Sequence, residues 1–554
     1  MQKLCSVARC AFGQRARHRA RDMILHSFKR HDGIRLLESP AELLKPIPLG
    51  NVVAHNFVRN ERRRAALDVH VSDYFWHRRM MSGFVVKTLV AGVRKPGFRR
   101  SVMTSGNKVL LNGSAGDRAR NLIRRSLEYS EESIDFFKTY YSEPLLPPSA
   151  HAEKIDADTC WIEVKNFYNF FHFLTESFHK AFSDRKVIKA ASKTVFKSGS
   201  KRVEGFVKKW IDDFREIIGS NVVIEAGSNG ADSAPSNIIT PLSAKHLLYQ
   251  FEGPHREMIN AARPPGHSWT GYDATPHPVK ILALNSVDDS MFEFRDAAIA
   301  LAKQRVERKW GRKIYVARSK AIARQRVMKG EDNLIAALQA KGFEVVYFED
   351  LSPLEQIRCV NGARCIVLQH GAGMANMMFA SSNTHVFELG TYQTAMSRWG
   401  DFIPIAHVAK CHYHHIFLDM DYEGEDTDPV FADHGLVAPV VSGEDVERVM
   451  SLILTHVRDK SDGVVGGLKT HAQALTGRQA YRQAYRLLDS YRQFVEDRAE
   501  YWEERAILDD LCGHRRSACN NFVKAWRISG SEAAKAAFIR LADREDYERH
   551  PDLR

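Results

Sequence analysis

The chain has 554 residues, of which 44% are hydrophobic and 27% are charged. This length is too great for a single hydrophobic core, so we expect about two to four globular domains and exclude a disordered tail. The formal net charge of +13 indicates attraction to something negative, which can be nucleic acid, an anionic membrane face or a phosphate-bearing substrate.

Cysteine usage and hydropathy bear on where the protein works. Eight cysteines are scattered without CxxC pairs, which fits a reducing cytoplasm better than a secreted disulfide scaffold. The N-terminal segment is basic but has no apolar stretch of signal-peptide length, and no segment approaches the roughly 20 apolar residues of a spanning helix. We expect a cytoplasmic protein, either free or peripheral on the inner face of the cell membrane.

Four regions follow one another along the chain. Residues 1–40 are an arginine-rich lead-in that is either solvated or in contact with an anionic surface. Residues 41–285 are expected to form a first α/β domain and residues 286–456 a second one. Residues 457–554 are highly charged, with apolar residues at helical spacing, and are expected to form a helical extension of unknown role.

Several segments of the first domain have the pattern of strands or helices. Residues 47–112 are strand-like and rich in turns, whereas residues 117–140 have the composition of a polar helix. Residues 160–183 run from an apolar strand into an aromatic-rich helix. A further helix over 203–218 precedes a strand over 221–227, so both elements are expected in this domain.

The second domain alternates strands with helices. Its strands are expected at 313–318, 344–348, 365–369 and 385–389. Strands that alternate with single helices imply a parallel, doubly wound sheet.

Two helices of this domain have clear signals. One begins at Ser352, which can cap it, because Pro353 suits the first helical position and Glu355 completes a capping box. The other begins near Asp289, and its apolar residues recur at the three- and four-residue spacing of one buried face. That face consists of Met291, Phe294, Ala298, Leu301 and Ala302.

Ligands of a parallel sheet bind at the carboxyl ends of its strands, so the residues just past each strand are candidates. After the strand over 365–369 comes a turn of small residues that can start a helix, and the N–H groups of a helix start favour a diphosphate. The turn contains His370, Gly371, Ala372, Gly373 and Asn376. Its pattern GxGxxN lacks the third glycine of the dinucleotide fingerprint, so a turn used only for helix packing is the alternative.

Two other strand ends carry charged residues. Arg318 ends the first strand and is followed by Ser319, Arg324 and Arg326, a cluster that either neutralises a departing nucleoside diphosphate or is a solvated basic loop. Glu388 closes the last strand, where a carboxylate can accept hydrogen bonds from ribose hydroxyls. A buried acid or a cap is the alternative for Glu388.

The aromatic-rich helix carries a candidate acid–base pair. His172 and Glu176 are four residues apart and therefore lie on one helix face. Desolvation in the apolar surroundings favours a general-base role for the carboxylate. A structural His–Glu pair on a core helix is the alternative.

The segment KCHYHH contains residues of metal-ligating types, namely Cys411, His412, His414 and His415. Ligands so close in sequence do not easily converge on one tetrahedral ion, and no distant CxxC or HxxxH completes the set. We therefore expect no metal site.

These motifs together resemble glycosyltransferase family 61. Its members share a strand followed by Arg-Ser, a helix, the letters GFE, a Gln-containing helix, the motif HGAxLxN and a strand that ends in Glu. The matching segments here are 314–319, 341–346, 354–367, 370–379 and 385–389. The family's upstream motif is similar to Asn169, His172 and Glu176, so the resemblance extends over residues 160–395.

The chain departs from the family pattern at two places. Where it reads RQRVMKGED, the family usually has Arg and then Asn-Glu, so either Arg324 or Arg326 is the matching arginine. Met374 stands where Leu is more usual.

The resemblance implies a GT-B-like architecture, in which two Rossmann-like domains face each other across a cleft and the C-terminal one holds a nucleotide sugar. It implies inverting transfer of a hexosyl or pentosyl group to a hydroxyl, with no cofactor and no bound metal. We expect the acceptor to be a glycan of a capsule, a lipopolysaccharide or another surface polysaccharide. Peripheral contact with an anionic membrane fits the basic charge, and nucleic acid is not expected as a partner.

The resemblance also implies roles for residues. Glu176 would be the base, with His172 as its orienter or as the alternative base, and Asn169 and Gln356 would support the site. The donor side would hold the leaving diphosphate through arginines and the glycine turn, and the ribose through a carboxylate. It would comprise Arg318, Ser319, Arg324, Arg326, His370, Gly371, Ala372, Gly373, Asn376 and Glu388.

Two other classes of function stay open at this stage. The sequence GAG in a strand–helix turn also suggests a nucleotide-dependent Rossmann oxidoreductase, although the third glycine is missing. The high isoelectric point suggests a non-enzymatic protein that binds anionic polymers, although its basic residues are spread among acidic ones.

Overall fold

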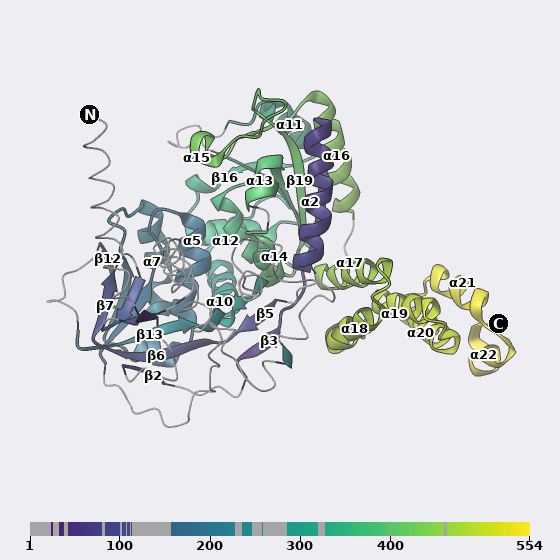
Figure 1. Cartoon of the computed structure of the whole chain (residues 1–554), viewed down its shortest axis with the longest axis horizontal. Helices are drawn as coiled ribbons and strands as arrows, with labels where there is room; N and C mark the ends of the chain where they lie inside the picture. The colour runs from purple at the N-terminus through teal and green to yellow at the C-terminus, as the bar shows by residue number, and fades with distance from the viewer. Residues whose placement is uncertain are drawn as a thin grey trace, which may run out of the picture.

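The structure is a computed structural model of the whole chain, and most of its residues are placed well enough to describe. Nearly all of the basic lead-in, the helix expected at 117–140, and Ser319, Arg324 and Arg326 lie outside these residues. The expected α/β class is confirmed, because the described residues form two large sheets covered by helices (Figure 1). The described residues are 24–25, 33–37, 42–79, 83–99, 102–106, 108–110, 112, 157–227, 235–245, 257–258, 285–318, 327–398, 400–458 and 462–553.

The first large sheet has six strands, and four of them are parallel neighbours. If these four strands are numbered 1 to 4 along the chain, their order across the sheet is 3-2-1-4. This is the strand order of half a Rossmann sheet. Two further strands extend the sheet in antiparallel fashion. The full order is β12 (Val222–Ala226), β11 (Lys193–Ser198), β10 (Thr159–Glu163), β13 (Asn237–Ser243), β6 (Thr88–Arg94) and β2 (Ile34–Leu36).

Two small sheets flank the first large one. Their strands are β1 (Ile24–Leu25), β9 (Lys108–Val109), β8 (Val102–Ser105) and β7 (Pro96–Arg99) in one, and β14 (Val287–Asp288), β5 (Phe84–Val86) and β3 (Leu44–Pro46) in the other.

The second large sheet holds six parallel strands with a short antiparallel one at the end. Its central strands are buried along their whole length, which explains why they are almost continuously apolar in sequence. The order is β16 (Glu344–Tyr347), β15 (Lys313–Ala317), β17 (Cys365–Gln369), β18 (His385–Thr391), β19 (His412–Met420) and β4 (Asn51–Asn56), with β20 (Pro439–Val440) antiparallel to β19.

The N-terminal part of the chain enters this second sheet. Strand β4 pairs with β19 from Asn51 to Asn56, although the expected domain bounds put these residues with the first sheet. Residues 61–79 form helix α2 rather than the expected strands, and Figure 1 shows this purple helix among the green elements of the second half. Tertiary ion pairs favour the helix, because Arg62 contacts Asp428 at 2.5 Å. Local strand propensity could not reveal these contacts.

One apolar core joins the two large sheets. Trp210 stacks on Phe379 with ring centroids 6.2 Å apart, and Phe178 meets Phe294 at 5.4 Å. The apolar face expected for the helix at Asp289 is confirmed by the burial of its five residues. The helices of this layer are α5 (Phe170–Glu176), η1 (Phe178–Phe182), α6 (Arg185–Ala190), α7 (Gly205–Ile218), α10 (Asp289–Arg305), α12 (Pro353–Gly362), η6 (Ala372–Phe379) and α14 (Ile403–Ala409).

Other helices cover the outer side of the second sheet. The expected capping box is confirmed, because Ser352 accepts a hydrogen bond from the backbone N–H of Glu355 while the Glu355 carboxylate accepts one from that of Ser352. Helices α11 (Glu331–Gln339) and α16 (Gly443–Val457) pack on that outer side, whereas Phe348 of η5 (Phe348–Asp350) belongs to the core between the sheets. The remaining elements of this half are α13 (Tyr392–Arg398) and α15 (Phe431–His434).

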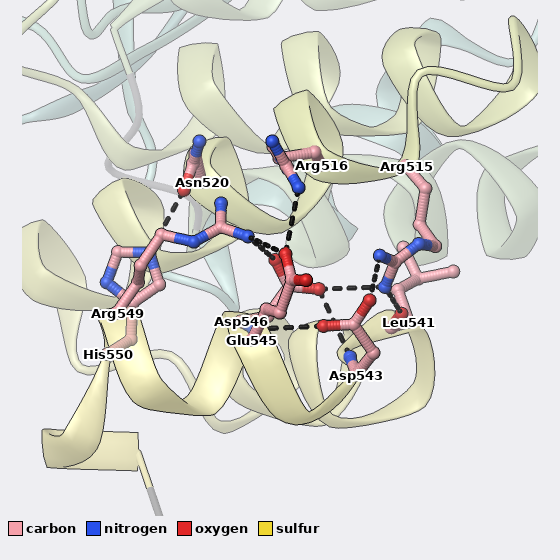
Figure 2. Close-up of polar contacts among 9 residues, drawn as sticks. All are labelled: Arg515, Arg516, Asn520, Leu541, Asp543, Glu545, Asp546, Arg549 and His550. Carbon is pink, nitrogen blue, oxygen red and sulfur yellow. Dashed lines mark hydrogen bonds and ion pairs between the residues drawn. The ribbon is translucent and has the colours of Figure 1, made fainter.

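The C-terminal region is helical and projects away from the two sheets (Figure 1). It packs its own apolar core, in which Leu488, Ala506 and Phe538 are buried. Figure 2 shows how Arg515 donates to the carboxylate of Asp546 at 2.7 Å and to that of Asp543, which joins two of its helices. Its helices are α17 (Gly463–Gly477), α18 (Tyr481–Val495), α19 (Ala499–Leu511), α20 (Arg515–Ser529), α21 (Glu532–Leu541), α22 (Arg544–Arg549) and η7 (Pro551–Leu553).

The hydropathy of the helices and the state of the cysteines can be stated for the described residues. Among the described helices, none is both long and apolar enough to cross a membrane. The cysteines within the described ranges are free thiols, namely Cys160, Cys359, Cys365, Cys411, Cys512 and Cys519.

Candidate active site

The candidate site lies where the strand order of the second sheet reverses. The chain runs from β15 outward to β16 and then returns to β17 on the other side of β15. Loops that leave neighbouring strands in opposite directions open a crevice at their carboxyl ends. Arg318 follows β15 directly and His370 follows β17 directly, so the two residues flank this crevice.

Arg318 is held against the glycine turn. Its Nη2 atom donates a hydrogen bond to the backbone carbonyl oxygen of His370. A Cβ atom on Gly371 would meet that same Nη2 at 2.1 Å, so a larger residue at this position would displace the guanidinium from its contact with the turn. Burial lowers the pKa of Arg318 below its ordinary value, while Glu349 and Glu331 oppose the shift. A guanidinium stays charged in proteins, so Arg318 places a cation at the crevice.

The turn itself rests on amide–amide contacts. The Asn376 side-chain amide donates to Gln356 Oε1 at 3.0 Å, and the Gln356 amide donates to the carbonyl oxygen of Phe348 at 2.8 Å. Asn376 is fully buried, whereas Ala372 is exposed at the start of helix η6. The buried amides therefore fix the turn, while Ala372 faces outward.

Glu388 occupies a different position from the expected one. Strand β18 continues to Thr391, so Glu388 lies inside the strand and is 0% exposed. Its carboxylate accepts hydrogen bonds from His370 Nδ1 and from the Tyr413 hydroxyl. His415 Nε2 lies 3.5 Å from the same carboxylate. These groups enclose the carboxylate away from the crevice.

The charge of Glu388 is stabilised locally. Burial alone would raise the pKa of this carboxyl, but His415, His370 and the hydrogen bonds from His370 and Tyr413 outweigh it. The pKa of Glu388 is therefore lower than usual, and the residue is a carboxylate at neutral pH. A carboxylate on Nδ1 selects the tautomer of His370 and fixes its ring.

The second half of the site lies on the first sheet. Asn169 caps helix α5 by accepting a hydrogen bond from the backbone N–H of His172 at 3.3 Å. His172 Nδ1 lies 2.9 Å from Glu176 Oε1, which confirms that the two side chains share a helix face. Lys165 Nζ lies 3.3 Å from Glu176 Oε2. The three side chains are 21–26% exposed, so this group is open to solvent.

Phe402 connects the two halves. Its ring lies 5.3 Å from Phe171 on helix α5 and 5.3 Å from the ring of His370. Phe171 directly precedes His172, so Phe402 contacts both the helix that carries the acid–base pair and the residue that opens the glycine turn. The structure thus brings together motifs that are about 200 residues apart in the sequence.

Sequence reasoning missed several residues of this site, namely Lys165, Gln369, Phe402, Tyr413 and His415. Tyr413 and His415 were detectable, because they alternate on a strand that must lie next to the strand of Glu388. Gln369 is buried at the end of β17, and its amide nitrogen has no hydrogen-bond partner among the described residues. Phe402 carried no signal, since a lone aromatic residue is usually core.

Within the described ranges, two groups of side chains have the residue types and spacing to hold a metal ion. His370, Glu388 and His415 form one group, and His55, His414 and His456 form the other. In the first group, the contacts of Glu388 with both rings account for the close approach. The second group lies on the opposite face of the sheet.

The fold and the site define a mixed α/β protein with charged groups gathered at the switch point of a doubly wound sheet. Residues 170–387 match the model of the family described as Glycosyltransferase 61. This match confirms the resemblance to glycosyltransferase family 61 over these residues. A search of the curated proteins found no match.

Proposed function

We propose that the protein transfers a sugar from a nucleotide-sugar donor to a hydroxyl of a glycan acceptor with inversion at the anomeric carbon and without a metal. The match of residues 170–387 to a glycosyltransferase family supports the class of reaction. The observation that carries the proposal is that Phe402 links the helix of His172 and Glu176 to His370, whose carbonyl oxygen accepts a hydrogen bond from Arg318.

The donor side supplies positive charge and N–H donors to the leaving diphosphate. Arg318 carries five N–H donors, and within the described residues it uses Nη2 on the carbonyl of His370. The backbone N–H groups at residues 371–373 and the buried amide of Gln369 are further donors. Preorganised donors of this kind contribute about 2.7–4 kcal/mol each to a transition state. Ser319 and Arg324 or Arg326 stay predicted members of this side.

Glu388 acts through His370 in this proposal. Its buried carboxylate is surrounded by His370, Tyr413 and His415, so it orients the imidazole rather than binding ribose itself. The ring of His370 then faces the donor with a fixed tautomer.

On the acceptor side, we assign the base to His172 Nε2. Glu176 Oε1 faces His172 Nδ1 and Glu176 Oε2 faces Lys165, so both carboxylate oxygens already face donors. A carboxylate on Nδ1 leaves Nε2 as the ring nitrogen that accepts a proton. Glu176 is then the orienting residue, which reverses the roles that the resemblance implies.

The reaction balances with these groups. The acceptor oxygen bonds to the anomeric carbon on the face opposite the diphosphate, and its proton passes to His172 Nε2. The bond from the anomeric carbon to the diphosphate oxygen breaks, and its electron pair leaves with the nucleoside diphosphate. Arg318 and the turn amides stabilise the charge that develops there.

The two sheets support a GT-B-like division of labour. Each contains parallel strands in an order typical of nucleotide-binding folds, and the candidate groups lie at the carboxyl ends of β10 and of β15 and β17. In this proposal the second sheet holds the donor and the first presents the acceptor. The net charge of +13 suits an anionic glycan of a surface polysaccharide, reached at the inner face of the cell membrane.

The test is thermal unfolding of the full chain with a panel of nucleoside diphosphates and nucleotide sugars. A ligand at 100 times its dissociation constant adds about 2.7 kcal/mol to the free energy of unfolding. We expect one nucleotide class to raise the midpoint in wild type and to raise it less in Arg318→Ala. A flat response across the panel would contradict the donor site.

A further inference from the structure

Five histidines gather on the face of the second sheet that points away from the candidate active site, namely His55, His385, His412, His414 and His456. His412 and His414 are two residues apart on β19 and therefore point to the same face. His385 pairs with His412 in register, and the neighbouring strand β4 contributes His55. His456 comes from α16, whose buried residues Val449 and Ile453 pack on this face.

Three of these rings converge on one point. His55 Nε2 lies 3.2 Å from His414 Nδ1, and the ring centroid of His456 lies 4.4 Å from that of His414. One ring nitrogen of each lies within 4.8 Å of the other two. Tetrahedral zinc with Zn–N bonds of about 2.0–2.1 Å holds two ligand nitrogens about 3.3 Å apart. The first pair already has this separation, and a ring nitrogen of His456 lies within 4.8 Å of both.

We propose that His55, His414 and His456 bind one divalent transition-metal ion, for which zinc is the best match. An all-imidazole set suits zinc and its neighbours in the first transition series, whereas magnesium and calcium prefer oxygen ligands. The ion would join strand β4, strand β19 and helix α16, three segments that are far apart in sequence. Its role is structural, because the candidate donor groups lie on the other side of the sheet.

The surroundings of His414 support this assignment. Its second ring nitrogen, Nε2, lies 3.1 Å from His385 Nδ1. A metal on Nδ1 requires the proton of His414 to be on Nε2, where it can be donated to His385. His385 in turn stacks on His412 at 4.2 Å, and His412 Nδ1 lies 3.0 Å from the Asn51 amide nitrogen. The ring that would bind the metal is therefore oriented by a second layer of contacts.

A hydrogen bond between His55 and His414 would explain only part of the arrangement of the three rings. It accounts for the contact between His55 and His414, but it does not require a third imidazole at the same point. His55 and His456 are only half-buried, so an ion can reach them from solvent.

The experiment uses the full chain without a histidine tag, treated with EDTA and dialysed. We expect one zinc ion per chain by elemental analysis, a midpoint of thermal unfolding that rises with zinc concentration, and a visible absorption band with Co²⁺. In His55→Gln and His456→Gln we expect the affinity for zinc to fall by roughly 100-fold or more, because each variant loses a direct ligand. Both side chains are half-buried, and circular dichroism checks that each variant is folded; if one variant does not fold, the other carries the test.

Two matched variants locate the ion. His434→Gln removes an exposed histidine of α15, and His415→Gln removes a buried histidine on the opposite face of the sheet. Both should bind zinc as wild type does. The proposal is overturned if wild type binds no zinc, if the folded His55 and His456 variants keep wild-type affinity, or if only His415→Gln loses the ion.

Discussion

The two halves of the candidate active site hold their charged groups in different ways. On the donor side, Glu388 is fully buried and surrounded by His370, Tyr413 and His415. On the acceptor side, the side chains of His172 and Glu176 are 26% and 24% exposed. A group that orients another residue can be sealed from water, whereas a group that exchanges a proton with a substrate must be reachable. The contrast supports the proposed roles, in which Glu388 orients His370 and His172 exchanges the proton.

The halves also differ in how the chain assembles them. The acceptor side comes from one segment, residues 165–176, whose members lie within two turns of one helix and its approach. The donor side combines the ends of β15 and β17 with the middle of β18 and β19. Substitutions should therefore act locally on the acceptor side and through neighbours on the donor side.

The largest effect is expected from removing the proposed base. His172→Ala should lower turnover by about 10²–10⁴-fold, because proton transfer by a positioned side chain contributes this much. The thermal midpoint and nucleotide affinity should change little, since the residue is partly exposed and lies on the acceptor side. Sugar transfer and nucleotide binding are measured on the same preparation, with His434→Ala as the control. Turnover near that of wild type would remove His172 from the mechanism.

Removing the donor-side cation should have the next largest effect. Arg318→Ala should lower turnover by about 10²–10³-fold while the fold persists, because one preorganised donor to the developing charge is lost. Arg318→Lys keeps the charge but not the forked geometry, so it should recover only part of the rate. Nucleoside diphosphate affinity should fall in parallel, unlike in His172→Ala. Equal effects of both variants on nucleotide affinity would break the division into two halves.

Replacing the buried carboxylate of Glu388 should reduce the stability of the fold. Glu388→Gln should lower the free energy of unfolding by about 2 kcal/mol, because hydrogen bonds to a charged acceptor are lost within a buried cluster. Denaturant unfolding measures this value, and Glu176→Gln on the open side is the matched comparison. A larger loss in Glu176→Gln would reverse the distinction between the halves.

The contribution of Glu388 should also depend on pH. Its carboxyl has a folded-state pKa below the ordinary value of 4.5, so below that pH the unfolded chain binds more protons than the folded one. The stabilisation is fully present above pH 4.5 and is lost as the pH falls through the lower folded-state pKa. The difference in unfolding free energy between wild type and Glu388→Gln should therefore shrink below pH 4.5. If the difference in unfolding free energy between wild type and Glu388→Gln stays constant as the pH falls well below 4.5, Glu388 is not a stabilising carboxylate in the folded protein.

The smallest effect compares two glycines of one turn. A Cβ on Gly371 would meet Arg318 Nη2 at 2.1 Å, whereas a Cβ on Gly373 would meet only Phe348 Cδ2 at 3.7 Å. Gly371→Ala should displace the arginine and weaken nucleotide binding about tenfold, or about 1.4 kcal/mol. Gly373→Ala should leave that binding nearly unchanged. Similar nucleotide affinities for the two variants would show that the contact between Arg318 and Gly371 does not contribute to nucleotide binding.

Much of the local structure followed from the sequence. The Ser352 capping box and the apolar face of α10 were predictable because capping and helical periodicity depend on residues within a few positions. The His172–Glu176 pair was predictable for the same reason. The parallel direction of strands β15 to β18 followed from the alternation of strands and helices.

Contacts between distant segments were not predictable from local patterns. Residues 61–79 were expected in strands, yet α2 is stabilised by ion pairs with a loop about 360 residues away. Neighbouring histidines of KCHYHH point to opposite faces of the sheet, because side chains alternate along strand β19. His55 and His456 reach the same point only because β4 pairs with β19 and α16 covers it.

By itself, the sequence determined the family, the class of fold and the helix that carries His172 and Glu176, because these depend on motifs and periodicities within short stretches. Tertiary structure alone decided that Glu388 is sealed behind His370, that Phe402 joins the two halves, and that strand β4 belongs to the second sheet. These facts depend on which strands are neighbours and on the faces they share. Loop closure between distant residues leaves no local pattern to read.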